Sequence, residues 1–125
     1  VHAYFADFDL TNICHFRATT QAFAASDDFP VLPPIDMLFV DGFHSAEQAR
    51  FDHETFVPLL ADGANVLFHD SSPEEFHSDI YGADKSYRHT VFDYVSDLRK
   101  DRRNEVMDFQ IDRGVALVRR HKEPL

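Results

Sequence analysis

Two stretches of the chain are almost continuously apolar, and each ends in an acidic residue. Ile35–Val40 reads IDMLFV and is followed by Asp41, whereas Asn65–Phe68 is followed by His69 and Asp70. Short apolar runs that are closed by turn residues predict strands buried on both faces, as in a parallel sheet. We therefore expect these two strands to be parallel and to lie at or near the centre of one sheet.

The residues between these strands have the pattern of an amphipathic helix. Ser45 is a suitable N-cap, and Gln48 follows it at the spacing of a capping box. Asp62 and Gly63 are expected to end this helix, because glycine readily adopts the left-handed conformation at a helix C-terminus. A parallel strand pair joined by a helix is the βαβ unit of α/β domains.

Further elements lie on either side of this unit. Upstream, Ile13–Phe16 is expected to be a short strand and Thr19–Ala25 a helix. Downstream, Thr90 is placed to cap a third helix. Val106–Ile111 and Val115–Arg119 have the apolar content of strands, and the short link between them predicts an antiparallel hairpin.

Composition and charge restrict the class of protein. The chain has 125 residues, 44% of them hydrophobic, which suits one domain with a real core. Its formal net charge of −10 disfavours nucleic acid and anionic membranes as partners. No apolar run is long enough to cross a bilayer, and no signal peptide is visible. With Cys14 as the single cysteine, no intrachain disulfide is possible, and we expect a cytoplasmic protein.

Four polar residues are expected to gather at one edge of the sheet. Ligands of open parallel sheets bind outside the carboxyl ends of the strands, where Asp41, His44, His69 and Asp70 should lie. Two carboxylates with an imidazole can coordinate a divalent cation such as Mg²⁺ or Mn²⁺. A histidine beside carboxylates can equally act as a general base near neutral pH. Acids at strand ends also serve simply as caps of the next helix, so the pattern leaves three interpretations open.

The segment from Ile35 to Ser72 resembles a known enzyme family. Its sequence is IDMLFVDGFHSAEQARFDHETFVPLLADGANVLFHDSS. It is similar to class I S-adenosylmethionine-dependent methyltransferases, in the branch with IDGxH after the fourth strand and HD after the fifth. Upstream, Phe16–Phe23 is similar to the family's segment after the third strand. Downstream, residues 106–119 are similar to its sixth and seventh strands.

This resemblance implies a fold, a cofactor and roles for several residues. The fold would be a Rossmann-like three-layer α/β sandwich with a mostly parallel sheet and a carboxyl-terminal antiparallel hairpin. S-adenosylmethionine would bind at Thr19, Asp41 and His44, and His44 or His69 would take the proton of the methyl acceptor. Some relatives hold Mg²⁺ at positions that correspond here to Asp41, His69 and Asp70.

The sequence departs from the family at its amino-terminal side. The family's glycine-rich loop after the first strand has no counterpart, because no Gly-x-Gly spacing occurs among the four glycines. We therefore expect residues 1–125 to be a single, partial methyltransferase-like domain that lacks the first strand and its loop. The sheet edge left open would favour a homo-oligomer.

Three hypotheses of function follow. The first is transfer of a methyl group from S-adenosylmethionine to an oxygen or nitrogen of a small molecule or sugar, by this chain or a longer parent. The second is a non-catalytic binding or assembly module with a degenerate methyltransferase fold. The third is a metal-dependent hydrolase in which Asp41, His69 and Asp70 surround a metal-bound water.

Overall fold

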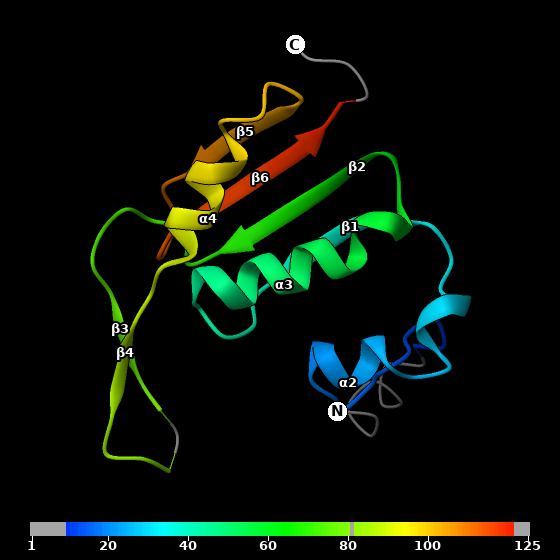
Figure 1. Ribbon diagram of the computed structural model, residues 1–125, viewed down its shortest axis with the longest axis horizontal. Coiled ribbons are helices and arrows are strands. Elements are labelled where there is room, and N and C mark those ends of the chain that lie inside the picture. Colours follow the sequence, from blue (N-terminus) through cyan, green and yellow to red (C-terminus); the bar gives the residue numbers. More distant parts are fainter. Residues whose placement is uncertain (1–9, 81, 122–125) are drawn as a thin grey trace. The chain divides into compact units, whose positions relative to one another are not determined.

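The computed structural model describes residues 10–80 and 82–121 (Figure 1). The chain divides into two compact units, Val1–Val31 and Leu32–Leu125, and each is described by itself. The first contains the short helix α2 (Thr20–Ala24) and one 3₁₀ turn, Phe29–Val31. The helix expected here is confirmed. The strand expected at Ile13–Phe16 is wrong, because these residues pair with no described strand and are exposed.

The second unit is built on a sheet of four strands in the order β1-β2-β6-β5. Their bounds are Ile35–Val40 (β1), Leu60–His69 (β2), Asn104–Phe109 (β5) and Val115–Arg120 (β6). β1 and β2 are parallel, and β2 with β6 and β6 with β5 are antiparallel. The parallel pair and the terminal hairpin are therefore confirmed. The mostly parallel sheet is wrong, since the described sheet is mixed.

Two helices cover the same face of this sheet, α3 (Ala46–Phe56) and α4 (Val91–Leu98) (Figure 1). The core lies between them and the strands, and Phe68 and Val95 are its largest fully buried side chains. Its other members are Val40, Ala49, Val66, Val91, Tyr94, Ala116 and Val118. The described part of this unit thus has two layers, and the third layer of a sandwich stays a prediction.

The strand β1 lies at an edge of the described sheet, not at its centre. Leu38 and Val40 face the helices and pack in or against the core, whereas Met37 is 63% and Phe39 55% exposed. The expected burial on both faces is therefore wrong. The reason is that both described helices of this unit lie on one side, so the apolar residues facing the other side remain open.

The helix α3 begins where the sequence predicts and ends earlier. The Ser45 hydroxyl accepts a hydrogen bond from the backbone N–H of Gln48 at 3.1 Å, which confirms the N-cap. The helix ends at Phe56, and the 3₁₀ turn Val57–Leu59 leads directly into β2. Val57 keeps helical backbone angles, but Pro58 has no N–H to donate to the preceding turn, so the α-helical hydrogen bonds stop before Gly63 is reached.

The polar segment after β2 forms a small antiparallel hairpin that the sequence did not predict. Its strands are β3 (His77–Asp79) and β4 (Ser86–Arg88). At the start of the segment, the N–H groups of Ser71 and Ser72 donate to the carbonyls of Gly114 and Arg113. The hairpin is thereby tied to the end of the sheet from which it leaves.

The segment is tied again where it ends, at Thr90. Thr90 is the N-cap residue of α4, as expected, but its hydroxyl makes no cap bond there. It accepts instead from the N–H of Ala46 at 2.8 Å, while the Thr90 N–H donates to the carbonyl of His44 at 2.9 Å. Thr90 therefore joins the start of α4 to the start of α3.

Candidate functional site at the carboxyl end of the parallel strands

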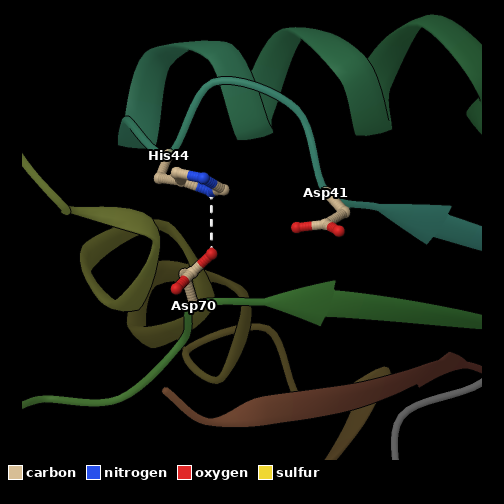
Figure 2. A group of neighbouring side chains, drawn as sticks. All are labelled: Asp41, His44 and Asp70. Carbon is tan, nitrogen blue, oxygen red and sulfur yellow. Dashed lines mark ion pairs between the residues drawn. The ribbon is translucent and has the colours of Figure 1, made fainter. Parts of the chain in front are cut away.

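The expected polar edge exists. Asp41 directly follows β1, and Asp70 directly follows β2. Because these strands are parallel, both carboxylates lie at the same end of the sheet, and the loop before α3 brings His44 beside Asp70, with Asp41 nearby (Figure 2). Asp41, His44 and Asp70 each offer one oxygen or nitrogen, and these three atoms lie within 4.8 Å of one another.

Asp70 is the centre of this edge. It is 3% exposed, and its Oδ2 lies 2.9 Å from Nδ1 of His44 and 2.9 Å from Nδ1 of His69. Its backbone has a φ of 53°, a left-handed conformation that aspartate and asparagine tolerate better than most residues. The local backbone thus turns a strand end into a buried carboxylate that faces several histidines.

His69 lies among three carboxylates. Besides Asp70, its Nδ1 is 3.2 Å from Asp41 Oδ1, and its Nε2 is 3.4 Å from Asp112 Oδ2. Burial lowers the pKa of His69, but the hydrogen bond with Asp70 and the charges of the aspartates outweigh it, so the pKa lies above its ordinary value. This arrangement favours a histidine that accepts a proton.

A third histidine, His89, also belongs to the edge. Its side chain is buried, with Nδ1 3.4 Å from Asp70 Oδ1 and Nε2 2.7 Å from the Ser78 hydroxyl oxygen. Burial lowers the pKa of His89 more than the opposing charge of Asp70 raises it. No local sequence pattern marks His89 as a site residue, because the β3–β4 hairpin alone brings it to Asp70.

Aromatic rings stand beside this polar edge. The rings of Phe43 and Tyr87 are stacked, with centroids 4.1 Å apart and planes inclined by 16°. Phe43 remains 49% exposed, so one side of this stack is open to solvent. An aromatic surface therefore lies one residue from His44.

The donor set at this edge suits a hard or borderline divalent cation. Two carboxylates and one imidazole are ligands that Mn²⁺ accepts, and carboxylates also suit Mg²⁺. The buried Oδ1 of Asp70 has no hydrogen-bond partner among the residues that the structure describes. The converging group contains His44, whereas His69 was the histidine expected as the third ligand. His69 instead contacts both acids through one nitrogen.

Thr19, the remaining candidate, belongs to the first unit. Its side chain accepts a hydrogen bond from the N–H of Ala22 at 3.2 Å and so caps α2. This contact gives Thr19 a structural role as the N-cap of α2. A role in adenosine binding stays a prediction.

A cavity of about 320 Å³ lies at the opposite end of the sheet from Asp70. Its lining includes His53, the start of β2 and the end of β6, but none of the four polar residues of the candidate site. Size alone therefore does not mark the chemical site, which is defined by its converging polar groups.

Comparison with known proteins identifies the fold. A family described as a methyltransferase domain matches residues 1–71, more than half of the chain and including both acids of the site. The chain belongs to this methyltransferase family. Its resemblance to class I S-adenosylmethionine-dependent methyltransferases is thereby confirmed, and no curated protein matches the chain significantly.

Solved structures agree with the methyltransferase family. One is a Staphylococcus aureus protein provisionally described as a caffeoyl-CoA O-methyltransferase, with a TM-score of 0.60 and 21% sequence identity. The match covers 95% of this chain and 57% of that protein. This chain thus spans little more than half the length of its structural relative, and the likeness concerns the fold. Among the residues that the structure describes, no helix is both long and apolar enough to cross a membrane.

Proposed function

We propose that this methyltransferase domain transfers a methyl group from S-adenosylmethionine to a hydroxyl of a small molecule, with a divalent cation at Asp41, His44 and Asp70. One observation carries the proposal: the donor atoms of these three residues converge at the carboxyl end of two parallel strands. In open α/β sheets this is where ligands bind. Membership in a methyltransferase family supplies the class of reaction.

The reaction is an in-line displacement. The acceptor oxygen attacks the methyl carbon, the bond from carbon to sulfur breaks, and S-adenosylhomocysteine leaves with the electron pair. The acceptor loses its proton to a base, for which His69 is our choice because His44 belongs to the group of cation donors. The carboxylates around His69 would stabilise its protonated form.

The cation would have a limited task. When bound, it would orient the acceptor hydroxyl and make it easier to deprotonate. Asp70 supplies the buried charge, Asp41 the more exposed carboxylate, and His44 a neutral nitrogen ligand. If no cation binds, His44 is an alternative base, because it keeps its contact with Asp70.

The cofactor side is less complete. Asp41 and His44 are proposed to contact the adenosine, but the sequence has no Gly-x-Gly turn to hold the methionine end. Small-ligand sites usually bury about 70–90% of the ligand. We therefore expect the 125-residue chain taken alone to bind S-adenosylmethionine weakly. The binding free energy should be less favourable by several kcal/mol, and each ~1.4 kcal/mol raises the Kd tenfold.

Two measurements test the proposal. The first is calorimetric titration of the chain with Mn²⁺ and, separately, with S-adenosylmethionine. The second is transfer of labelled methyl groups to a panel of phenols, catechols, sugars and a caffeoyl thioester, the last because the structural relative carries that name. Transfer that requires Asp70 and the cation would support the proposal. Binding of neither ligand, with no transfer, would contradict it.

The alternative of a non-catalytic module is favoured by one observation, the missing Gly-x-Gly spacing. Such a module would keep the fold and the polar edge while failing to hold the methyl donor. Micromolar binding of S-adenosylmethionine to the chain would exclude this alternative and would also show that the pocket is complete. Binding of Mn²⁺ without S-adenosylmethionine would favour it.

A further inference from the structure

His89 is held beside Asp70 by several contacts at once. Its ring lies beside those of His44 and Tyr87, with centroid distances of 4.6 Å and 5.6 Å. The backbone N–H of His89 donates to the backbone carbonyl of Phe76 at 2.9 Å. Ser78, which stands on β3, contacts its Nε2 at 2.7 Å. Stacking, backbone and hydroxyl together fix the direction in which the imidazole points.

That direction leads to Asp70. Nδ1 of His89 and Oδ1 of Asp70 are 3.4 Å apart, and both are buried without a hydrogen-bond partner among the described residues. Buried polar atoms left unpaired are destabilising, because they have lost their hydrogen bonds to water. A small shift that brings the two atoms into hydrogen-bond geometry would satisfy both at once.

Only one neutral form of the imidazole allows this pairing. If Nδ1 carries the proton, it can donate to the carboxylate, and the unprotonated Nε2 can accept from the Ser78 hydroxyl. If Nε2 carries the proton, the lone pair of Nδ1 faces the carboxylate and repels it. The carboxylate of Asp70, which can only accept, therefore selects the tautomer with Nδ1–H, and the Ser78 hydroxyl matches it by donating to Nε2.

We propose that His89 is a positioning residue of this site: its Nδ1–H donates to Oδ1 of Asp70 and so directs Oδ2 toward His44 and His69. Ser78 completes the arrangement on the far side of the ring, where its hydroxyl donates to Nε2. The inference about tautomer and orientation concerns residues of this chain alone, whereas its effect on cation binding rests on the proposed function. Partners of this kind, one step behind a ligand, typically change metal affinity about 10- to 100-fold.

The first test needs neither metal nor activity. Nitrogen NMR of the ¹⁵N-histidine-labelled chain, at neutral pH and without metal, distinguishes protonated from unprotonated ring nitrogens. We expect Nδ1 of His89 to be protonated and Nε2 unprotonated, with this preference weakened in Asp70→Asn, whose amide can present an N–H in place of an oxygen. A protonated Nε2 in the wild-type chain would overturn the proposal.

The second test uses two matched substitutions of His89. His89→Asn places an amide N–H near the position of Nδ1 and keeps the donor to Asp70, whereas His89→Gln reaches Ser78 and loses that donor. We expect Mn²⁺ affinity to fall about 10- to 100-fold in His89→Gln and by less than about 10-fold in His89→Asn. Equal losses in the two variants would overturn the positioning role.

Controls separate this inference from the proposed function. His77→Gln changes an exposed histidine on the same hairpin and should leave Mn²⁺ affinity unchanged. If His89→Gln does not fold, as circular dichroism would reveal, Ser78→Ala carries the affinity test, with a loss expected in the same direction. If the wild-type chain binds no Mn²⁺, the cation part of the proposed function fails, and the NMR result alone decides the role of His89.

Discussion

Two clusters of histidine and aromatic rings in this molecule use the same residue types for opposite purposes. In the core cluster, the ring of His53 packs edge-on against Phe68 and lies near Tyr94, with centroid distances of 5.4 Å and 5.9 Å. In the site cluster, His44 and His89 lie beside Tyr87. Both clusters are in the unit Leu32–Leu125, and α3 runs from one to the other.

The difference between them is a buried carboxylate. In the core cluster, Nδ1 of His53 meets the Tyr94 hydroxyl at 2.8 Å, and burial, with the charge of Arg120, lowers the pKa of His53 to about 4. Burial likewise raises the pKa of Tyr94 to about 12. In the site cluster, Asp70 meets His44 and His69. Burial alone therefore produces an uncharged, packed histidine, and an acid must be buried with it before the ring can serve proton or metal chemistry.

The largest expected effect is on the core cluster. Phe68→Ala removes a side chain with no exposed surface, which should lower the free energy of unfolding by about 3–5 kcal/mol. Phe39→Ala is the matched control, because Phe39 is on the neighbouring strand and 55% exposed, and should cost much less. Denaturant unfolding of both variants measures the contrast. Equal losses would mean that the open face is packed in solution.

The second effect is the pH dependence of the core cluster. The pKa of His53 is about 4 in the folded chain against 6.5 ordinarily, so between these values the unfolded chain binds more protons. Its stabilising contribution is complete above pH 6.5 and is lost as pH falls toward 4, by about 3 kcal/mol in total. Unfolding should be compared across this range in the wild type and in His53→Gln. If the pKa of His53 were the ordinary one, the free energy of unfolding would depend on pH equally in the wild type and in His53→Gln.

The third effect belongs to the site cluster. Asp70→Asn keeps a residue that tolerates a φ of 53° but removes the buried charge, so Mn²⁺ affinity should fall at least ~100-fold, about 2.7 kcal/mol. Asp112→Asn makes the same change at a φ of 50°, on an exposed side chain. Calorimetric titration should find Asp112→Asn close to wild type. A similar loss in both variants would show that general negative charge, not the buried carboxylate, attracts the cation.

The smallest effect concerns the helix that joins the clusters. Ser45→Ala removes the side-chain cap on the N–H of Gln48 and should lower the free energy of unfolding by about 1 kcal/mol. Ser45→Asp restores a capping oxygen at the positive end of the helix and should recover most of the loss. Thermal unfolding of the two variants gives the comparison. No recovery with aspartate would assign the loss to packing around Ser45.

Sequence patterns predicted the polar edge because its geometry is simple. Asp41 and Asp70 each follow an apolar strand, and two strands joined by a crossover helix run in parallel, so both acids must meet at one end. His44 is close to Asp41 in the chain and follows from the same argument. No ladder or helical spacing connects His89 with Asp70, and the β3–β4 hairpin that joins them has too few apolar residues to predict.

The errors in the fold also have physical causes. An apolar run such as Ile35–Val40 cannot indicate whether one face or both will be covered, because coverage depends on where the helices pack. The order of strands likewise depends on long-range pairing, which placed the hairpin strand β6 beside β2 and made the sheet mixed. Pro58 is the local signal for the end of α3, whereas the prediction relied on Gly63 and therefore made the helix too long.

The segment between β2 and α4 is held at its two ends, so the residues between these ends can be exchanged. At one end Gly114, where an added Cβ would stand 2.5 Å from the backbone nitrogen of Ser72, keeps the chains in close contact. At the other end Thr90 is bonded to His44 and Ala46. These contacts are made by backbone groups, and the only side chain that takes part among those named is the Thr90 hydroxyl. Protein engineers can therefore exchange the turn between Asp79 and Ser86 while leaving the acids, His44, Ser78 and His89 in place.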